Sequence, residues 1–226
     1  MTTKLPLVSV ALCGDSAVGK SCMFKRFITD KFNLSEKTTV SCDVSVKKVQ
    51  HGDEFVNLQL WDTAGQEAFR SMSQSYFRGR HAMCFCFDIT RKETFSAVPG
   101  WVREFQQNQS TSAKLMLVGC KCDLSANRQV PVEEAEKYAI ENSMMYCECS
   151  AKQGTNIETI FDTIVSQVRD SQTHPQSTQQ AQNPQDDTKR LTRTAFTSRK
   201  PAPNPQIEQV TITEVKKPFD FATDCC

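Results

Sequence analysis

Two short segments of this chain carry residue types that handle phosphate groups and a metal ion. The first segment fits the phosphate-loop spacing G-x-x-x-x-G-K-[ST] and reads Gly14-Asp15-Ser16-Ala17-Val18-Gly19-Lys20-Ser21. Its glycines let the backbone curl so that N–H groups face a phosphate, and the following helix adds its positive N-terminal dipole. Lys20 is expected to contact the β- and γ-phosphates, and the Ser21 hydroxyl to ligate Mg²⁺. We count these eight residues, together with Cys22, as nucleotide-binding; the plainer alternative is an ordinary glycine turn.

The second segment, residues 61–67, reads Trp-Asp-Thr-Ala-Gly-Gln-Glu and supplies an acid, a glycine and a glutamine in close order. Asp62 is expected to complete the metal site through a water; taken alone, it could equally cap a turn. Gly65 can offer its N–H to a γ-phosphate with no side chain in the way. Gln66 can orient a water for attack on that phosphate. Together the two segments predict a site that hydrolyses a nucleotide and changes shape when it does.

Alternating strand-like and helix-like segments between Leu5 and about Asp170 would position these residues. Short apolar runs predict strands at Leu5–Cys13, Ala82–Asp88, Lys114–Gly119 and Met144–Glu148, with a hairpin of Val40–Val49 and Phe55–Trp61. Amphipathic stretches predict helices at Lys20–Thr29, Glu93–Gln107, Val132–Asn142 and Asn156–Val168. This alternation predicts an α/β fold of the P-loop NTPase type. Its mostly parallel six-stranded sheet would carry helices on both faces and one antiparallel edge strand.

Composition narrows the function classes. A net charge of +1 over 226 residues offers no basic field for nucleic acid. No apolar run reaches the roughly 20 residues that cross a bilayer. Of eleven cysteines, nine are scattered through apolar runs and are predicted to be small buried hydrophobes in a reducing cytosol. The pairs Cys120-x-Cys122 and Cys147-x-Cys149 do not match a zinc signature.

The motifs resemble those of the Rab GTPases, within the Ras superfamily, over roughly residues 5–170. The resemblance rests on GDSAVGKS at 14–21, WDTAGQE at 61–67, YFRG at 76–79, GCKCDL at 119–124 and ECSAK at 148–152. It implies a switch that binds GTP or GDP with Mg²⁺. It also implies intrinsic GTP hydrolysis on the order of 10⁻⁴–10⁻³ s⁻¹ until an activating protein supplies an arginine. By similarity, Thr39 is the first-switch threonine that ligates Mg²⁺ and reaches the γ-phosphate, and Phe32 lies against the guanine.

By the same resemblance, two further loops choose the base. Asp123 would accept hydrogen bonds from guanine N1–H and N2–H₂, which adenine cannot offer. The Lys121 stem would pack on the base. In the loop Ser150-Ala151-Lys152, the Ala151 N–H would meet the guanine O6.

The sequence departs from the Rab pattern at two sites. Cys120 stands where the family has an asparagine that ties the base loop to the phosphate loop, and a thiol is a weak substitute for an amide. The loss is expected to cost about 1–3 kcal/mol, or roughly ten- to a hundredfold in affinity, with faster nucleotide release. Neutral compensation and a loss of cycling are the alternatives. Val44 replaces an aromatic that the family combines with the equivalents of Trp61 and Tyr76 as an effector surface.

The composition changes after about Asp170, and we divide the chain into a GTPase domain, 1–170, and a tail, 171–226. Ser171–Gln206 is rich in Gln, Pro, Thr and Ser and cannot bury enough apolar surface to order itself. The terminal pair Cys225-Cys226 resembles the Rab double-geranylgeranylation signal, and two lipid chains anchor durably.

The resemblance implies a monomer that cycles between the cytosol and the cytoplasmic face of an endomembrane and directs vesicle traffic. Its implied partners are an exchange factor, a GTPase-activating protein, a GDP-dissociation inhibitor, a prenylation escort protein and effectors. No nucleic acid is expected among them. One alternative is a nucleotide-bound scaffold that cycles poorly because of Cys120 and the altered first switch. Another is a P-loop kinase or ATPase, against which Gln66, Asp123 and the Ser150 loop argue.

Overall fold

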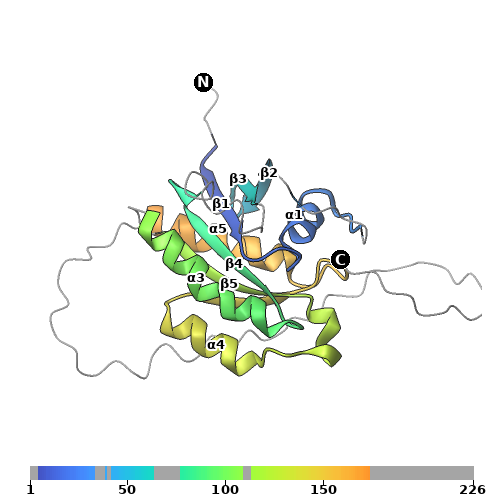
Figure 1. Ribbon diagram of the computed structural model, residues 1–226. Coiled ribbons are helices and arrows are strands. Elements are labelled where there is room, and N and C mark those ends of the chain that lie inside the picture. The colour runs from blue at the N-terminus through green and yellow to red at the C-terminus, as the bar shows by residue number, and fades with distance from the viewer. Residues whose placement is uncertain (1–4, 34–38, 40–41, 64–76, 109–112, 174–226) are drawn as a thin grey trace, which may run out of the picture. The chain divides into compact units, whose positions relative to one another are not determined.

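The computed structural model describes residues 5–33, 39, 42–63, 77–108 and 113–173 of the 226-residue chain. Within them, six strands form one sheet in the order β2-β3-β1-β4-β5-β6 (Figure 1). Five of the strands run parallel, and β2 alone pairs antiparallel with its neighbour β3. The strands are β1 (Leu7–Cys13), β2 (Asp43–His51), β3 (Glu54–Asp62), β4 (Ala82–Asp88), β5 (Lys114–Cys120) and β6 (Met145–Cys149). The predicted sheet, with its antiparallel edge strand, is confirmed.

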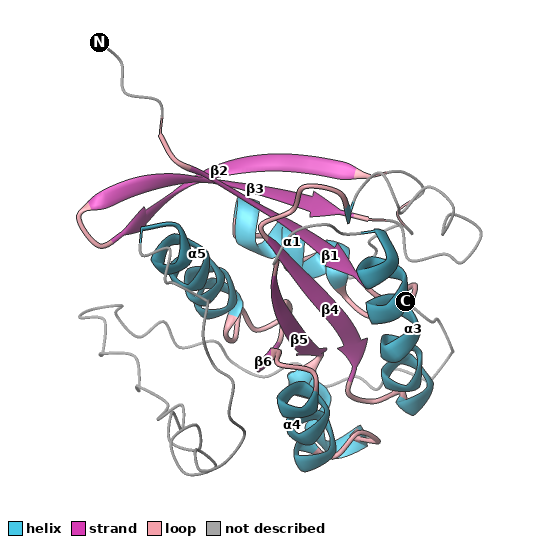
Figure 2. Ribbon diagram, turned by 90° about the vertical axis from the view of Figure 1, so that its left-hand side faces the viewer, coloured by secondary structure: helices cyan, strands magenta, loops and turns pink. Residues whose placement is uncertain are grey.

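Helices cover both faces of the sheet, as predicted (Figure 2). One face packs against α1 (Lys20–Thr29) and α5 (Ile157–Thr173). The other packs against α3 (Lys92–Asn108) and α4 (Val132–Glu141). Each face therefore has its own apolar core, and the strands between the two cores are held from both sides.

The burial of each strand follows from its place in the sheet. Every residue of β4 is buried because this central strand has helices on both faces, which explains its unbroken apolar sequence. In β3 the buried residues alternate, at Val56, Leu58 and Leu60, because only one face of this strand is covered by helices. The opposite face of β2 and β3 keeps exposed side chains, including Val44 and Val46.

Three features differ by more than two residues from the predicted elements. Strand β2 begins at Asp43, whereas the prediction began at Val40, which lies outside the described residues. Helix α5 continues past Val168 to Thr173. A short 3₁₀ helix at Cys122–Asn127, between β5 and α4, was not predicted, because it has no apolar face and no buried residue to produce a pattern.

The predicted burial of the nine internal cysteines is confirmed for five of them. Cys13, Cys84, Cys86, Cys120 and Cys149 are buried, whereas the other four keep partial exposure. Within the described part of the chain, the cysteines form no disulfide. Strands β4, β5 and β6 carry most of the buried group, where a small side chain fits between the sheet and its helices.

The division into a domain, 1–170, and a tail, 171–226, stays a prediction, since residues 174–226 lie outside the described part. Among the helices that the structure describes, none combines the length and the apolar character needed to cross a bilayer.

Candidate functional site

The phosphate loop connects the end of β1 to the start of α1, at the edge where the parallel strands end. Open α/β sheets bind their ligands at this edge. Gly14 has a φ of 139° and Gly19 a φ of 117°, values that side-chain-bearing residues rarely adopt. A Cβ atom on Gly14 would collide with the Cys86 carbonyl oxygen of β4. Among the residues that the structure describes, no side chain caps α1, so the N–H groups of its first turn are available to an anion.

Lys20 holds its ammonium group across this loop. The side chain is 5% exposed, and its Nζ donates to the carbonyl oxygens of Gly14 at 2.8 Å and Asp15 at 2.7 Å. A buried cation whose hydrogen bonds go to carbonyl oxygens retains strong attraction for a phosphate.

Helix α3 and the turn before it hold the outer part of the phosphate loop. Trp101 Nε1 donates to Asp15 Oδ1 at 2.8 Å, and Arg91 Nη2 donates to the Ser16 carbonyl oxygen at 3.1 Å. Sequence reasoning missed both contacts. They join residues more than seventy positions apart, and neither Arg91 nor Trp101 belongs to a motif, so no spacing signal could have revealed them.

Three oxygen-bearing side chains gather beside the loop. Ser21 Oγ and Thr39 Oγ1 lie 2.6 Å apart, and Thr39 Oγ1 lies 3.4 Å from Asp62 Oδ2. Asp62 is fully buried, and within the described residues its Oδ1 has no hydrogen-bond partner. Burial raises the pKa of Asp62, while hydrogen bonding to Ser21 and the charge of Lys20 act in the opposite direction. Two hydroxyls and a buried carboxylate with an unpaired oxygen are a hard donor set that fits Mg²⁺.

The two predicted base loops meet at the ends of β5 and β6. Asp123 Oδ1 accepts a hydrogen bond from Ser150 Oγ at 2.6 Å, and Ser150 Oγ accepts from the Gln153 N–H at 3.1 Å. Ser150 is buried, while Ala151 is partly exposed and Lys152 exposed. The hydroxyl therefore orients the carboxylate, and the other carboxylate oxygen can serve as an acceptor.

Cys120 lies directly under the phosphate loop. It is buried, and a Cβ atom on Gly19 would lie 3.4 Å from Cys120 Cβ and 3.7 Å from its Sγ. The next residue, Lys121, has a φ of 65° and turns its chain back so that its Nζ lies 2.8 Å from Asp88 Oδ2. Sequence reasoning placed the Lys121 stem on the base but missed this carboxylate.

The predicted effector residues Val44 and Trp61 are direct partners in the register of β2 and β3. Val44 is 43% exposed, and the Arg80 guanidinium stacks 3.8 Å from the centre of the Trp61 ring. Phe32, the residue expected against the guanine, follows α1 with its side chain partly buried.

Other predicted site residues cannot be placed. The residues that lie outside the described part of the chain are Gly65, Gln66, Tyr76, Cys225 and Cys226. The described ones bring together an anion-binding loop with its lysine, a cluster of hard oxygen donors and two loops with a free acceptor. Such an arrangement can bind a nucleoside phosphate with a divalent cation.

Comparison with known proteins agrees with this geometry. The family model described as "Ras family" matches residues 9–170. The chain is 41% identical to Ras-related protein Rab-30 of Homo sapiens over 155 residues, covering 69% of this chain and 76% of the relative. It is 36% identical to Ras-related protein Rab-8B of Pongo abelii over 162 residues, 72% of this chain and 78% of the relative. It is also 36% identical to the GTP-binding protein YPT1 of Saccharomyces cerevisiae over 180 residues, 80% and 87% of the two chains.

Proposed function

Because this chain belongs to the Ras family and is related to Rab proteins, we propose that it is a membrane-anchored GTPase switch that regulates vesicle traffic. The observation that carries the switch is the contact of Thr39 with Ser21 and Asp62. Thr39 lies outside both catalytic motifs, and yet its hydroxyl joins the donor set beside the phosphate loop. A residue from a separate segment at this place can sense whether a γ-phosphate is bound.

Each side chain of the site has a separate task in the proposed reaction. Lys20 and the first turn of α1 bind the β- and γ-phosphates, and Asp123 with the Ser150 loop selects guanine. Ser21, Thr39 and Asp62 would hold Mg²⁺, which when bound neutralises charge on the phosphate oxygens. Gln66 would orient the water that attacks the γ-phosphate.

Loss of the γ-phosphate would change the shape of the molecule. Thr39 and Gly65 would each contact that phosphate while GTP is bound, and hydrolysis would release both segments. The exposed face of β2 and β3, where Val44 lies opposite Trp61, would then no longer be flanked by the segments that carry Thr39 and Gly65. We assign effectors to this face. An exchange factor, a GTPase-activating protein, a GDP-dissociation inhibitor and a prenylation escort protein would be the regulators.

Single-turnover hydrolysis tests the function. The GTP-loaded protein is expected to hydrolyse on the order of 10⁻⁴–10⁻³ s⁻¹ with Mg²⁺ and to stop when the metal is chelated. Gln66→Leu should slow the reaction about tenfold or more, because leucine cannot form the hydrogen bond that would orient the attacking water. Gln106→Leu, an exposed substitution on α3, is the matched control. Stable GTP binding without turnover, even with activating proteins, would instead indicate a nucleotide-bound scaffold. A preference for ATP over GTP would indicate a P-loop kinase or ATPase.

The anchor is tested separately with the full chain. Incubation with geranylgeranyl diphosphate, an escort protein and its transferase is expected to add two lipid groups, and the product should bind phospholipid vesicles. A variant with Cys225→Ser and Cys226→Ser should gain no mass and stay in the supernatant. Cys122→Ser is the control and should gain lipid and bind vesicles as the wild type does. Equal vesicle binding by the wild type and the double variant would refute the lipid anchor.

A further inference from the structure

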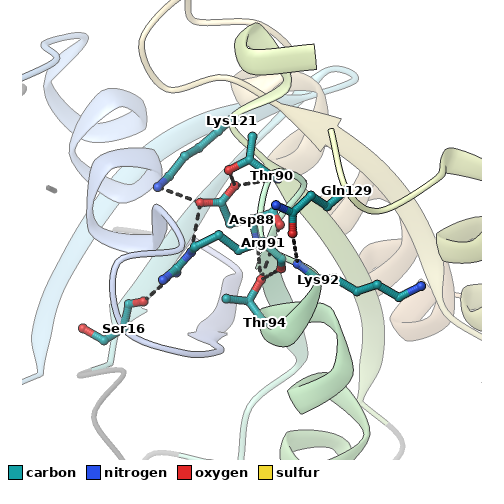
Figure 3. A network of polar contacts seen from close by, with 8 residues as sticks. All are labelled: Ser16, Asp88, Thr90, Arg91, Lys92, Thr94, Lys121 and Gln129. Atoms are coloured by element: carbon teal, nitrogen blue, oxygen red, sulfur yellow. Dashed lines mark hydrogen bonds and ion pairs between the residues drawn. The ribbon is translucent and has the colours of Figure 1, made fainter. Parts of the chain in front are cut away.

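A buried carboxylate, Asp88, lies between the phosphate loop and the base loop (Figure 3). It is the last residue of β4, and its side chain is 1% exposed. Its Oδ2 lies 2.8 Å from Lys121 Nζ and forms an ion pair with Arg91 Nε at 3.4 Å. Its Oδ1 accepts hydrogen bonds from the Thr90 N–H at 2.9 Å and the Thr90 hydroxyl at 2.7 Å. One carboxylate therefore pairs with two cations that come from different loops.

Arg91 extends this network to the phosphate loop. Its Nη2 donates to the Ser16 carbonyl oxygen at 3.1 Å, while its Nε faces Asp88. Figure 3 shows the guanidinium between the carboxylate and Ser16. The turn that carries Arg91 is itself fixed, because Thr94 Oγ1 accepts from the Asp88 N–H at 3.0 Å and donates to the Arg91 carbonyl at 2.7 Å. A continuous chain of polar contacts thus joins Ser16 to Lys121.

The direct contact between the same two loops is apolar in character. Cys120 lies beside Gly19, where a Cβ atom added to the glycine would be 3.4 Å from Cys120 Cβ, and a thiol is a weak donor and a weak acceptor. Among the described residues, the polar connection between the loops runs through Asp88 and Arg91. Beyond the pairing of β1, β4 and β5, this connection is therefore what can fix the two loops relative to each other.

Lys121 and Thr90 support the ionised form of Asp88. Burial by itself raises the pKa of Asp88, but hydrogen bonds from Lys121 and Thr90 outweigh it, so the pKa is lowered and the carboxylate stays ionised at neutral pH. Removal of one partner from a buried charge is costly, because the remaining charge has lost compensation without regaining water. Arg91 is 38% exposed in its side chain, so its removal need not unfold the protein.

We propose that Arg91 is a positioning residue for nucleotide retention. By bridging Asp88 and the Ser16 carbonyl, it keeps the phosphate loop at a fixed distance from the base loop and so slows nucleotide release. The inference rests on the proposed function and adds to it a residue that lies in none of the nucleotide-binding motifs.

The test measures dissociation of a fluorescent GDP with Mg²⁺ and excess GTP as chaser. Arg91→Ala is expected to release GDP about tenfold faster than the wild type, within the range of couplings in a shared network. Arg91→Lys, which keeps a cation beside Asp88, should recover part of the difference. The matched control is Lys92→Ala, since the Lys92 side chain pairs with Glu134 at the surface, at 3.3 Å, and the variant keeps the backbone N–H that donates to Gln129. If Arg91→Ala does not fold by circular dichroism, Arg91→Gln takes its place.

A second background separates positioning from a general loss of stability. In Cys120→Asn, an amide beside Gly19 can supply a direct polar link between the loops. The Arg91→Ala effect in this background should therefore fall below about threefold. Equal effects in both backgrounds, or an Arg91→Ala rate no faster than that of Lys92→Ala, would overturn the inference alone. Failure of the wild type to bind GDP would overturn the proposed function and this inference together.

Discussion

Asp123→Asn is expected to weaken GDP binding at least about a hundredfold while leaving the fold intact. In the structure, Asp123 Oδ1 is held by the Ser150 hydroxyl, and the second carboxylate oxygen is available to the base. In the asparagine variant, the amide oxygen can still accept the hydrogen bond from Ser150. The amide nitrogen then faces guanine N1–H and N2–H₂, and because all of these groups are donors, no hydrogen bond forms. Two hydrogen bonds to a charged acceptor, at about 1.5–3 kcal/mol each, account for a loss of this size.

Base selectivity provides the decisive measurement. Equilibrium titration should show that the wild type prefers GDP to IDP, which lacks the 2-amino group, and that Asp123→Asn abolishes the preference. Asp30→Asn is the control, because Asp30 is exposed and ends α1 in a left-handed conformation that asparagine tolerates. If the Asp123 variant kept the wild-type ratio of GDP to IDP affinity, another group would be reading the base.

Gly14→Ala is expected to lower the free energy of unfolding by about 3 kcal/mol or more. The added methyl group would collide with the Cys86 carbonyl of β4, and its backbone φ of 139° disfavours any side chain. Both effects act together, since neither the loop nor the central strand can move without disturbing the sheet. The protein should therefore unfold at a clearly lower urea concentration and lose nucleotide binding.

Gly52→Ala measures the cost of a side chain at a positive φ without a collision. Gly52 also has a positive φ, 57°, but no atom lies within 4 Å of the position that its Cβ would take. Its substitution should cost only about 1–2 kcal/mol, the penalty of the left-handed region. Urea denaturation of the two variants gives the comparison. Equal midpoints would show that the contact with Cys86 has no energetic consequence.

Much of the fold could be predicted because its elements carry their own periodicity. The bounds of α1 and β4 agree with the predictions, since each has a pattern set by the faces that it buries. The end of α5 and the 3₁₀ helix at Cys122–Asn127 could not be predicted in this way. The described side chains in the last turn of α5 and in the short helix are not buried. No apolar pattern therefore marks where these segments begin or end.

The candidate site, like the fold, could be predicted from the sequence only in part. Sequence alone predicted the phosphate loop, because it is a short contiguous motif whose spacing sets its local backbone geometry. It also predicted Asp62 within the segment 61–67, whereas the base loops were implied by the resemblance to Rab GTPases. Cys120 was also recognised as a departure from the family pattern. The surroundings of Cys120 could not be predicted, because they depend on how β5 lies beneath Gly19.

The sequence by itself determined the kind of sheet, and it predicted the set of residues that we propose to bind a nucleotide. Only the tertiary structure decided how the loops that carry them are held together. Arg91 and Trp101 reach the phosphate loop because β4 pairs with β1, which brings α3 and the turn before it beside residues far away in the chain. Asp88 meets Lys121 because β4 and β5 are paired so that Asp88 lies opposite Cys120. Such contacts follow from strand register, which local spacing does not encode.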